Sequence, residues 1–356
     1  MPTDLLDLTA QIVSVPSVSR QEQALTAWLE GELRAVPGLV VDRVGENLVA
    51  RTQLGRSQRL ILAGHTDTVP PDGNADARID GDRCYGVGST DMKSGLAVMV
   101  EAARTIAEPA VDVTYVFYAR EEVAAVESGL LELFEVAPEL VRGDAALLGE
   151  PTDGTLEAGC QGTMRLRVSL CGRRAHPARP WMGRNAIHRL GAVLATLATY
   201  VEREPEIQGC RYHEALQAVR VEGGVALNVV PDAAEVLVNH RFAPDRTPAE
   251  AEAHVRALLA PHLEPGDDIT VIDVADGAAP SLDHPLIAAL VQRNALEVRA
   301  KLGWTDVARF AAHGIPAANF GPGDAEIAHM AGEFVTRRQL DRVWTAVNDL
   351  LLRGPG

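Results

Sequence analysis

The sequence predicts an α/β protein in which a mostly parallel, helix-covered sheet is interrupted by a smaller α+β segment. Its 356 residues, of which 47% are hydrophobic, exceed what one compact core usually holds. Short apolar runs alternate with helical patterns in the first part, whereas polar and apolar residues alternate one by one in the middle. We therefore expect two domains, one formed by residues 1–166 and 279–356 and the other by residues 167–278.

Three short apolar runs are the expected strands of the larger sheet: Leu60–Ala63, Val113–Tyr118 and Ala145–Leu148. None of them alternates with a period of two, which is typical of strands buried on both faces. A helical pattern over Lys93–Ile106 separates the first two runs. This order favours βαβ units, in which neighbouring strands pair in parallel.

Three segments carry the signature of a helix start, a hydroxyl residue followed three positions later by Glu or Gln. The pairs are Ser19 with Glu22, Thr247 with Glu250, and Thr336 with Gln339. In the second pair, Pro248 stands at the first helical position, which suits proline. These signals predict helices near residues 20–34, 248–262 and 337–352.

The middle of the chain has the pattern of an antiparallel sheet with one solvated face. The stretches MRLRVSL and AEVLVNHRF alternate polar with apolar residues, and a helical pattern over Ala186–Tyr200 lies between them. This predicts helices on one face of an antiparallel sheet. A further helical pattern, PLIAALVQ, and an apolar stretch at Ile315–Phe320 are expected to return the chain to the first domain.

Charge and composition narrow the class of function. The formal net charge of -16 opposes binding to nucleic acid or to an anionic membrane, so an anionic substrate would need a local cluster of arginines. The N-terminal stretch lacks the pattern of a signal peptide, and no apolar window reaches membrane-spanning length. Four cysteines, Cys84, Cys160, Cys171 and Cys210, show no CxxC spacing. We expect a cytoplasmic protein with reduced thiols.

Acidic residues follow each of the three expected strands, and a histidine also follows the first. The first run leads into His65 and Asp67, the second into Glu121 and Glu122, and the third into Glu150. Ligands of open α/β sheets bind beyond the carboxyl ends of the strands, so these side chains should converge on one crevice. His65 and Asp67 share a face of extended backbone, so Asp67 could orient the imidazole toward a metal, although a buried structural histidine is the plainer interpretation.

Two further candidates lie in glycine-rich loops. The loop GVGSTDMKSG resembles a phosphate-binding loop but has Met92 in place of the glycine before Lys93. Asp91 within it stands at a helix start, where it could bridge two cations or simply cap the helix. His329 follows a turn-rich loop, and Glu333 could support it.

The adjacent Glu121 and Glu122 could have two different chemical roles. Neighbouring residues at a strand end point in different directions, so one carboxylate could bind metal while the other accepts a proton from water. A solvated acidic pair is the alternative.

In this order, GHTDTVP, GVGSTDMKSG, REE, LGEPT and GPGDAEIAH resemble the metal-site motifs of the aminoacylase and carboxypeptidase type of dinuclear zinc hydrolases. The resemblance implies a catalytic α/β domain with a mostly parallel sheet, interrupted by a ferredoxin-like dimerisation or lid domain. It also implies two Zn²⁺ per chain, with Co²⁺ or Mn²⁺ able to substitute. By motif, Asp91 would bridge the ions, His65 and Glu150 would complete one site, and Glu122 and His329 the other. Glu121 would be the general base and Asp67 its orienting partner.

The same resemblance assigns residues of the expected insert. His176, in RRAHPAR, matches a histidine that reaches the partner's active site in a homodimer and stabilises the oxyanion, although a basic surface hairpin is the alternative. Further residues are expected to hold the substrate: Asn228, Arg241, Arg179, Arg184 and Thr305.

Within the family, four stretches are most similar to the succinyl-diaminopimelate desuccinylase subgroup: EAGCQGT, GRRAHPARPWMGRNAIH, GGVALNVVPD and GWTDVARFAAHGIP. This implies removal of succinate from N-succinyl-LL-2,6-diaminopimelate in lysine and diaminopimelate biosynthesis. N-acetylornithine, other acyl-amino acids and peptides are the alternative substrates. Gln161, Trp304 and Asp306 depart from the subgroup's pattern.

Overall fold

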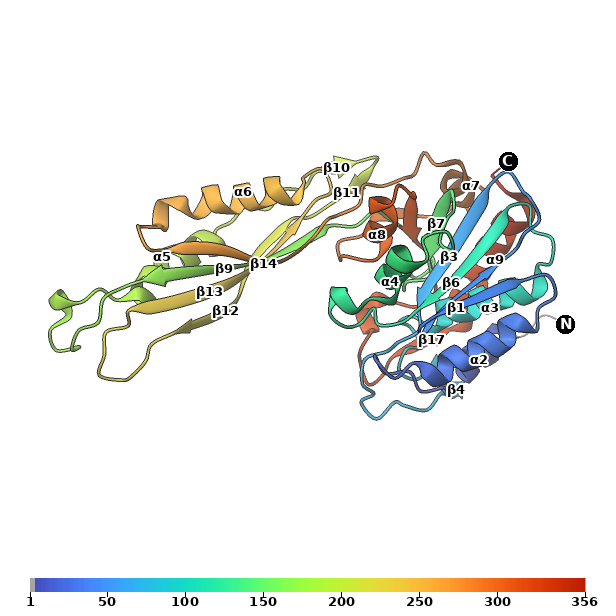
Figure 1. Cartoon of the computed structure of the whole chain (residues 1–356), viewed down its shortest axis with the longest axis horizontal. Helices are drawn as coiled ribbons and strands as arrows, with labels where there is room; N and C mark the ends of the chain where they lie inside the picture. The colour runs from blue at the N-terminus through green and yellow to red at the C-terminus, as the bar shows by residue number, and fades with distance from the viewer. Residues whose placement is uncertain (1–3, 356) are drawn as a thin grey trace. The chain divides into compact units, whose positions relative to one another are not determined.

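The computed structural model describes residues 4–355, which form two compact units (Figure 1). Unit 1 contains the residues up to Ala158, Pro280–Arg299 and those from Arg309 onward, and unit 2 contains Gly159–Ala279 and Ala300–Ala308. The sequence places residues 300–308 with the first domain, whereas the structure places them in unit 2. There the Lys301 carbonyl accepts a hydrogen bond from the Gln161 backbone N–H at 3.2 Å.

Unit 1 is built on a sheet that has eight strands in the described part of the chain, in the order β1-β2-β6-β3-β7-β16-β8-β15. The strands are β1 (Val40–Val44), β2 (Asn47–Arg51), β3 (Arg59–His65), β6 (Asp112–Tyr118), β7 (Ala145–Leu148), β8 (Leu156–Ala158), β15 (Val298–Ala300) and β16 (Ala317–Asn319). The central strands β6, β3, β7 and β16 pair in parallel. Every residue of β6 and β7 is buried, which confirms the expectation from their unbroken apolar runs.

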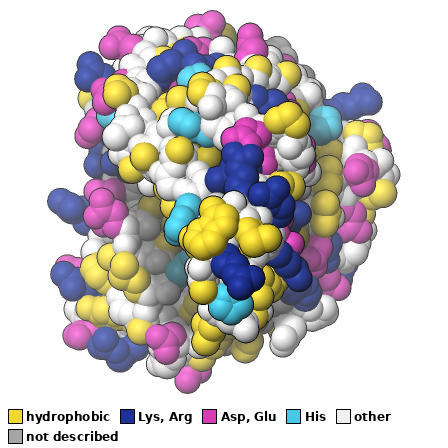
Figure 2. All heavy atoms as spheres, turned by 90° about the vertical axis from the view of Figure 1, so that its left-hand side faces the viewer, with side chains coloured by type: hydrophobic (Ala, Val, Ile, Leu, Met, Phe, Trp, Pro, Cys, Tyr) yellow, Lys and Arg dark blue, Asp and Glu magenta, His cyan; other side chains and the backbone are white. Residues whose placement is uncertain are grey.

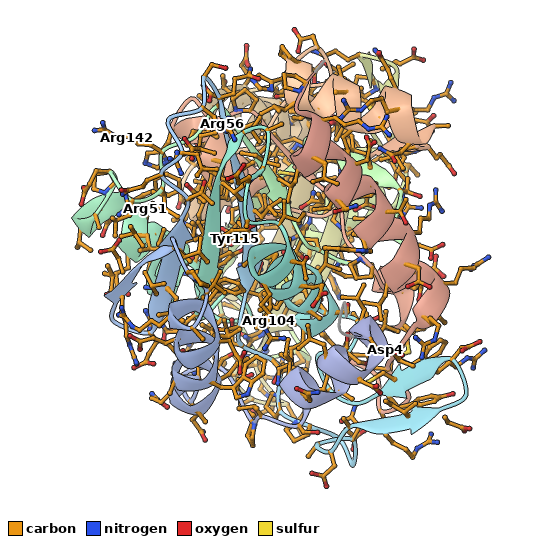
Figure 3. All side chains as sticks on the ribbon, turned by 90° about the vertical axis from the view of Figure 1, so that its right-hand side faces the viewer. Asp4, Arg51, Arg56, Arg104, Tyr115 and Arg142 are labelled. Carbon is orange, nitrogen blue, oxygen red and sulfur yellow. The ribbon has the colours of Figure 1, made fainter. Side chains whose placement is uncertain are left out.

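Helices cover this sheet. They are α1 (Leu5–Val13), α2 (Gln23–Arg34), α3 (Lys93–Thr105), α4 (Gly129–Val136), α7 (Pro285–Asn294), α8 (Val307–Ala312) and α9 (Arg337–Arg353). Helices α1, α3 and α9 pack against one another, and Figure 3 shows them lying in front of the sheet. A small sheet of β4 (Arg78–Asp80), β5 (Arg83–Tyr85) and β17 (Phe334–Thr336) lies beside α1.

Two of the three expected helix starts form as capping boxes, and one does not. Thr336 caps α9 with Gln339, and Thr247 caps α6 (Pro248–Leu259) with Glu250. The expected start at Ser19 is wrong, because α2 begins at Gln23 and no side chain caps it. The Ser19 hydroxyl donates instead to the Asp67 carboxylate at 2.7 Å.

Unit 2 has the βαββαβ order of a ferredoxin-like fold. Its elements are β9 (Gly162–Cys171), α5 (Ala186–Ala198), β12 (Ala215–Gly223), β13 (Ala233–Phe242), α6 and β14 (Asp268–Ala275), with a short hairpin of β10 (Glu206–Ile207) and β11 (Cys210–Arg211) after α5. The strands pair antiparallel in the order β12-β13-β9-β14. Buried and exposed residues alternate along β9 and β13, and the buried ones join α5 and α6 in one core. Most polar residues of β9 and β13, among them Arg165, Arg167 and Glu235, lie on the opposite face.

The loops at residues 173–185 and 223–230 of unit 2 are largely exposed. They carry apolar side chains in contact with solvent: Trp181, Met182 and Leu227. Figure 2 looks onto this side of the molecule, where basic and apolar side chains lie next to one another. Within residues 4–355, no helix combines the length and apolar character that a membrane span requires.

Candidate metal centre

The candidate ligands come from strand ends that the sheet order places side by side. His65 is the last residue of β3, Glu121 and Glu122 follow β6, and Glu150 follows β7. Because β3 lies between β6 and β7 and pairs in parallel with both, these residues leave the same edge of the sheet. Asp91 joins them from the loop that precedes α3.

Asp91 presents its two carboxylate oxygens to two different histidines. Oδ1 lies 3.1 Å from His65 Nε2, and Oδ2 lies 3.6 Å from His329 Nε2. The same His329 nitrogen lies 2.8 Å from Glu122 Oε1. One carboxylate therefore stands between two sets of nitrogen and oxygen donors, as a bridging ligand would.

Three groups of donors are close enough to hold an ion. They are His65, Asp91 and Glu150; Asp91, Glu122 and His329; and His65, Glu121 and Glu122, with ligand atoms within 4.8 Å of one another in each group. The first two groups share only Asp91. Each offers three histidine or carboxylate ligands and leaves a position open, which suits catalytic Zn²⁺. The residues present therefore fit two metal ions.

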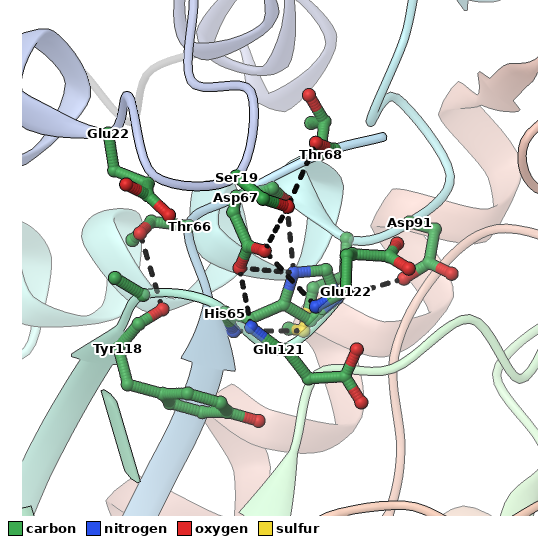
Figure 4. Close-up of polar contacts among 12 residues, drawn as sticks. Ser19, Glu22, His65, Thr66, Asp67, Thr68, Asp91, Tyr118, Glu121 and Glu122 are labelled. Carbon is green, nitrogen blue, oxygen red and sulfur yellow. Dashed lines mark hydrogen bonds and ion pairs between the residues drawn. The ribbon is translucent and has the colours of Figure 1, made fainter. Parts of the chain in front are cut away.

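Asp67 lies next to His65 and binds the backbone of Glu121 and Glu122 (Figure 4). Its fully buried carboxylate accepts hydrogen bonds from the N–H of Glu121 (2.9 Å), the N–H of Glu122 (3.1 Å) and the hydroxyl of Ser19 (2.7 Å). Burial raises the pKa of Asp67, but the interaction with His65 and these hydrogen bonds outweigh it and lower the pKa to about 2. The group is therefore an anion at neutral pH.

The contact between His65 and Asp67 differs in detail from the sequence-based expectation. His65 Nδ1 lies 3.0 Å from the Asp67 backbone carbonyl oxygen and 3.6 Å from its carboxylate Oδ1. A proton on Nδ1 would therefore be held mainly by the carbonyl. The consequence is the expected one, because Nε2 is left to face Asp91 and a metal.

The charge of the site favours a cation. Contacts with Asp91 and Glu122 raise the pKa of His329 to about 9, and contacts with Asp67 and Asp91 raise that of His65 although its burial acts in the opposite direction. Burial raises the pKa of Asp91, but its hydrogen bonds to the two histidines outweigh this and lower it. These carboxylates hold positive charge on both histidines, and metal ions would take the place of those protons.

Glu333 supports Asp91 rather than His329. Its Oε1 accepts hydrogen bonds from the backbone N–H of Thr90 (2.8 Å) and of Asp91 (3.1 Å), and its side chain is buried. The buried carboxylate thus anchors the loop that carries the bridging residue.

The family can be assigned from the whole chain. The model of Peptidase family M20/M25/M40 matches residues 61–353. The chain belongs to this family. The predicted enzyme class, a hydrolase of this type, is thereby confirmed.

Among relatives of this M20 chain are proteins named for one activity. A putative succinyl-diaminopimelate desuccinylase of Mycobacterium tuberculosis is 49% identical over 353 residues, covering 98% of this chain and 97% of the relative. A succinyl-diaminopimelate desuccinylase of Corynebacterium glutamicum is 44% identical over 336 residues, covering 93% and 91% of the two chains.

Solved structures of other proteins share the fold. A tripeptidase of Staphylococcus aureus superposes with a TM-score of 0.78 at 21% identity, covering 98% of this chain and 97% of the other. A Bacillus subtilis protein described as a dinuclear metal-binding peptidase of the M20 family superposes with a TM-score of 0.68 at 17% identity, covering 98% and 96%. These likenesses confirm the predicted fold class.

The proposed catalytic His176 and the substrate residues expected by resemblance all belong to unit 2: Arg179, Arg184, Asn228, Arg241 and Thr305. His176, Arg179 and Asn228 are exposed, and His176 Nδ1 accepts a hydrogen bond from the Ala178 N–H at 3.2 Å. Thr305 is buried, and its hydroxyl has no hydrogen-bond partner within residues 4–355.

The arginines of unit 2 differ in whether an acid already binds them. Arg184 pairs with Glu264, and Arg174 pairs with Asp232 at 2.7 Å. Arg241, half-buried on the polar face of the sheet, has no acidic partner within residues 4–355. Burial and the nearby Arg165 lower the pKa of Arg241. The ordinary pKa of an arginine is so high that the guanidinium nevertheless stays charged at neutral pH.

Two of the residues that depart from the subgroup's pattern, Gln161 and Trp304, form hydrogen bonds within unit 2. The Gln161 side-chain amide donates to the Leu302 carbonyl at 3.1 Å, and the Trp304 indole N–H donates to the Asp276 carbonyl at 3.0 Å. These bonds attach the segment 300–308 to the rest of unit 2. Asp306 is buried in the same segment.

Proposed function

We propose that this chain hydrolyses the amide bond of N-succinyl-LL-2,6-diaminopimelate, releasing succinate and diaminopimelate for lysine and diaminopimelate biosynthesis. The observation that carries the proposal is the Asp91 carboxylate, whose two oxygens face His65 and His329. This arrangement suits two zinc ions, with Asp91, His65 and Glu150 at one and Asp91, Glu122 and His329 at the other. The names of the relatives at 49% and 44% identity support the choice of acyl group.

Bound at these residues, two zinc ions would polarise the amide carbonyl. They would also lower the pKa of water enough for it to lose a proton near neutral pH and attack the carbonyl carbon. In this proposal Glu121 accepts the proton of the attacking water and returns it to the departing amine. The backbone N–H of Glu121 donates to Asp67, so the general base is held by a buried, ionised neighbour. Water supplies a hydroxyl to the succinyl carbon and a hydrogen to the amine, which balances the reaction.

Recognition of the substrate is assigned to unit 2. The substrate is anionic and the chain carries a net charge of -16, so local cations must bind its carboxylates. Arg241 suits this role because its guanidinium is half-buried and unpaired by acids within residues 4–355. Such a group gains more from a carboxylate than an arginine that already has one.

Further residues of unit 2 complete the proposal. We assign substrate contacts to Arg179, Arg184, Asn228 and Thr305 as well, and propose that unit 2 forms a homodimer through which His176 reaches the partner's site. There its imidazole would donate a hydrogen bond to the oxyanion of the tetrahedral intermediate. The exposure of His176 supports this, because no other group of unit 2 encloses its ring.

The experiment that tests the substrate compares two acyl-amino acids on one preparation loaded with zinc. We expect kcat/KM for N-succinyl-LL-2,6-diaminopimelate to exceed that for N-acetylornithine by at least about 100-fold, because the acetyl group has no carboxylate to pair with the half-buried Arg241 and the other cations proposed to bind the substrate. Equal values would reject the desuccinylase assignment and leave the two-metal hydrolase. Full activity after removal of all metal would reject both.

A further inference from the structure

We infer that Ser19 is a positioning residue of the active site, holding Asp67 in the orientation in which it anchors the backbone of Glu121 and Glu122. The inference rests on the proposed hydrolase function for its effect on rate, but its structural part does not. Figure 4 shows Ser19 and Asp67 directed toward one another. The two residues are 48 positions apart in the sequence, so this contact exists only in the folded chain.

The hydrogen bonds to Asp67 show what Ser19 contributes. Asp67 Oδ1 accepts the N–H of Glu121 at 2.9 Å, while Oδ2 accepts the N–H of Glu122 at 3.1 Å and the hydroxyl of Ser19 at 2.7 Å. The Ser19 bond is the shortest of the three. A buried carboxylate depends on such donors, so removing the hydroxyl would leave Oδ2 with the weaker of its two donors.

The segment that carries Ser19 is fixed mainly by its backbone, although the hydroxyl also lies 3.3 Å from the Thr68 carbonyl oxygen. The Ser19 N–H donates to the Thr68 carbonyl at 3.0 Å, and the Thr68 N–H donates to the Ser17 carbonyl at 2.9 Å. Because α2 has no side-chain cap, loss of the hydroxyl also removes nothing from the helix. Substitutions at Ser19 should therefore leave the fold intact and act mainly on the support of Asp67, because the two backbone bonds keep the segment in place when the longer hydroxyl contact with Thr68 is lost.

A second contact ties the same segment to the loop after Glu122. The Arg20 guanidinium binds Glu127 through two hydrogen bonds of 2.7 Å, and the Arg120 guanidinium binds the Glu127 carbonyl at 2.7 Å. Arg20 is largely exposed, so its ion pair contributes little. The part-buried Ser19–Asp67 bond is thus the contact from this segment that supports the anchor of Glu121 and Glu122.

The chain offers a matched control two residues away. The Ser17 hydroxyl is buried and has no hydrogen-bond partner within residues 4–355, so Ser17→Ala removes a hydroxyl from the same segment without touching Asp67. Ser19→Thr keeps the hydroxyl and should behave like the wild type. Ser19→Cys keeps the size of the side chain but donates only weakly, and serves as a second variant if Ser19→Ala fails to fold.

The test measures backbone hydrogen exchange of the full chain together with kinetics. In Ser19→Ala we expect the amides of Glu121 and Glu122 to exchange roughly tenfold faster, with the amides of β6 unchanged, because only the anchor of this turn is weakened. We expect kcat to fall about tenfold with KM nearly constant, since a misplaced base slows the chemical step. Ser17→Ala and Ser19→Thr should match the wild type in both measurements.

The two measurements separate failure of this inference from failure of the proposed function. Unchanged exchange at Glu121 and Glu122, or an increase that extends through β6, would overturn the positioning role whatever the activity is. A wild-type chain that hydrolyses no acyl-amino acid would reject the proposed function, and the exchange data would still decide the role of Ser19.

Discussion

The two units differ in whether their candidate site residues already contact other polar groups of the chain. In unit 1, contacts join His65 to Asp91 at 3.1 Å and His329 to Glu122 at 2.8 Å, and Asp67 binds the backbone of the acidic pair. In unit 2, Asn228 is exposed, and Arg241 has no acidic partner within residues 4–355.

This difference indicates which step each unit controls. Residues held by one another before substrate arrives provide the fixed geometry that bond breaking requires. Charged groups without a partner are available to bind a ligand. Changes in unit 1 should therefore act on metal content and kcat, and changes at the proposed substrate-binding residues of unit 2 on the choice of substrate. His176 is the proposed exception in unit 2, because it would act on kcat in the partner's site. The predictions below test this division, beginning with the largest effect.

The adjacent glutamates of unit 1 provide the strongest test. Glu121→Gln removes the proposed base but no ligand of the two sets that share Asp91, so we expect kcat to fall by at least about 100-fold. Elemental analysis should still find two metal ions per chain. Glu122→Gln is the control, because it weakens a proposed ligand and should lower metal content. Loss of metal from the Glu121 variant, with an unchanged rate per metal ion, would reverse the two roles.

The sequence was most informative about unit 1, for a geometric reason. Buried parallel strands are recognisable as apolar runs, and their ends must leave the same edge of the sheet, so His65, Glu122 and Glu150 could be grouped without a structure. Asp91 and His329 could not be grouped in this way, because they lie in loops whose path local pattern does not determine. Their grouping came from the family resemblance.

Ser19 shows where local reasoning fails. Its spacing from Glu22 satisfies the capping-box pattern, as that of Thr336 from Gln339 does, yet only Thr336 caps a helix. The Ser19 hydroxyl binds Asp67 instead, a residue far away in the sequence. A pattern of a few residues cannot show that a distant carboxylate competes for the hydroxyl. Such conflicts between local signal and structure are expected near functional sites.

A test of unit 2 uses mixed dimers. If His176 acts in the partner's site, a heterodimer of one His176→Ala chain and one Glu121→Gln chain contains one site with both groups intact. We then expect a rise from the near-zero rates of the parent homodimers to about half the wild-type rate per dimer, because one complete site is restored. Differently tagged chains allow the heterodimer to be purified and assayed. If His176 acts within its own chain, both sites are defective and no activity returns.

The smallest expected effect concerns the arginines of unit 2, where the structure makes a finer distinction than the sequence does. By sequence, Arg184 and Arg241 are both candidates for the succinyl carboxylate. In the structure Arg184 binds Glu264, whereas Arg241 is half-buried and has no acidic partner within residues 4–355. A carboxylate arriving at Arg184 would first have to displace an existing one. Arg241 should therefore be the stronger determinant of specificity.

Arg241→Ala should lower the ratio of kcat/KM between the succinylated and acetylated substrates by about tenfold, the scale of one lost charged hydrogen bond at a partly solvated site. The loss should appear in the succinylated substrate, since the acetyl group has no carboxylate to lose contact with. Arg184→Ala removes the weaker of the two proposed contacts and should change the ratio by less than about twofold, because its guanidinium already pairs with Glu264 in an exposed ion pair. An equal fall for both substrates in Arg241→Ala would mean that Arg241 maintains the sheet rather than reading the acyl group. A larger change in the ratio for Arg184→Ala than for Arg241→Ala would show that the ion pair with Glu264 opens when substrate binds.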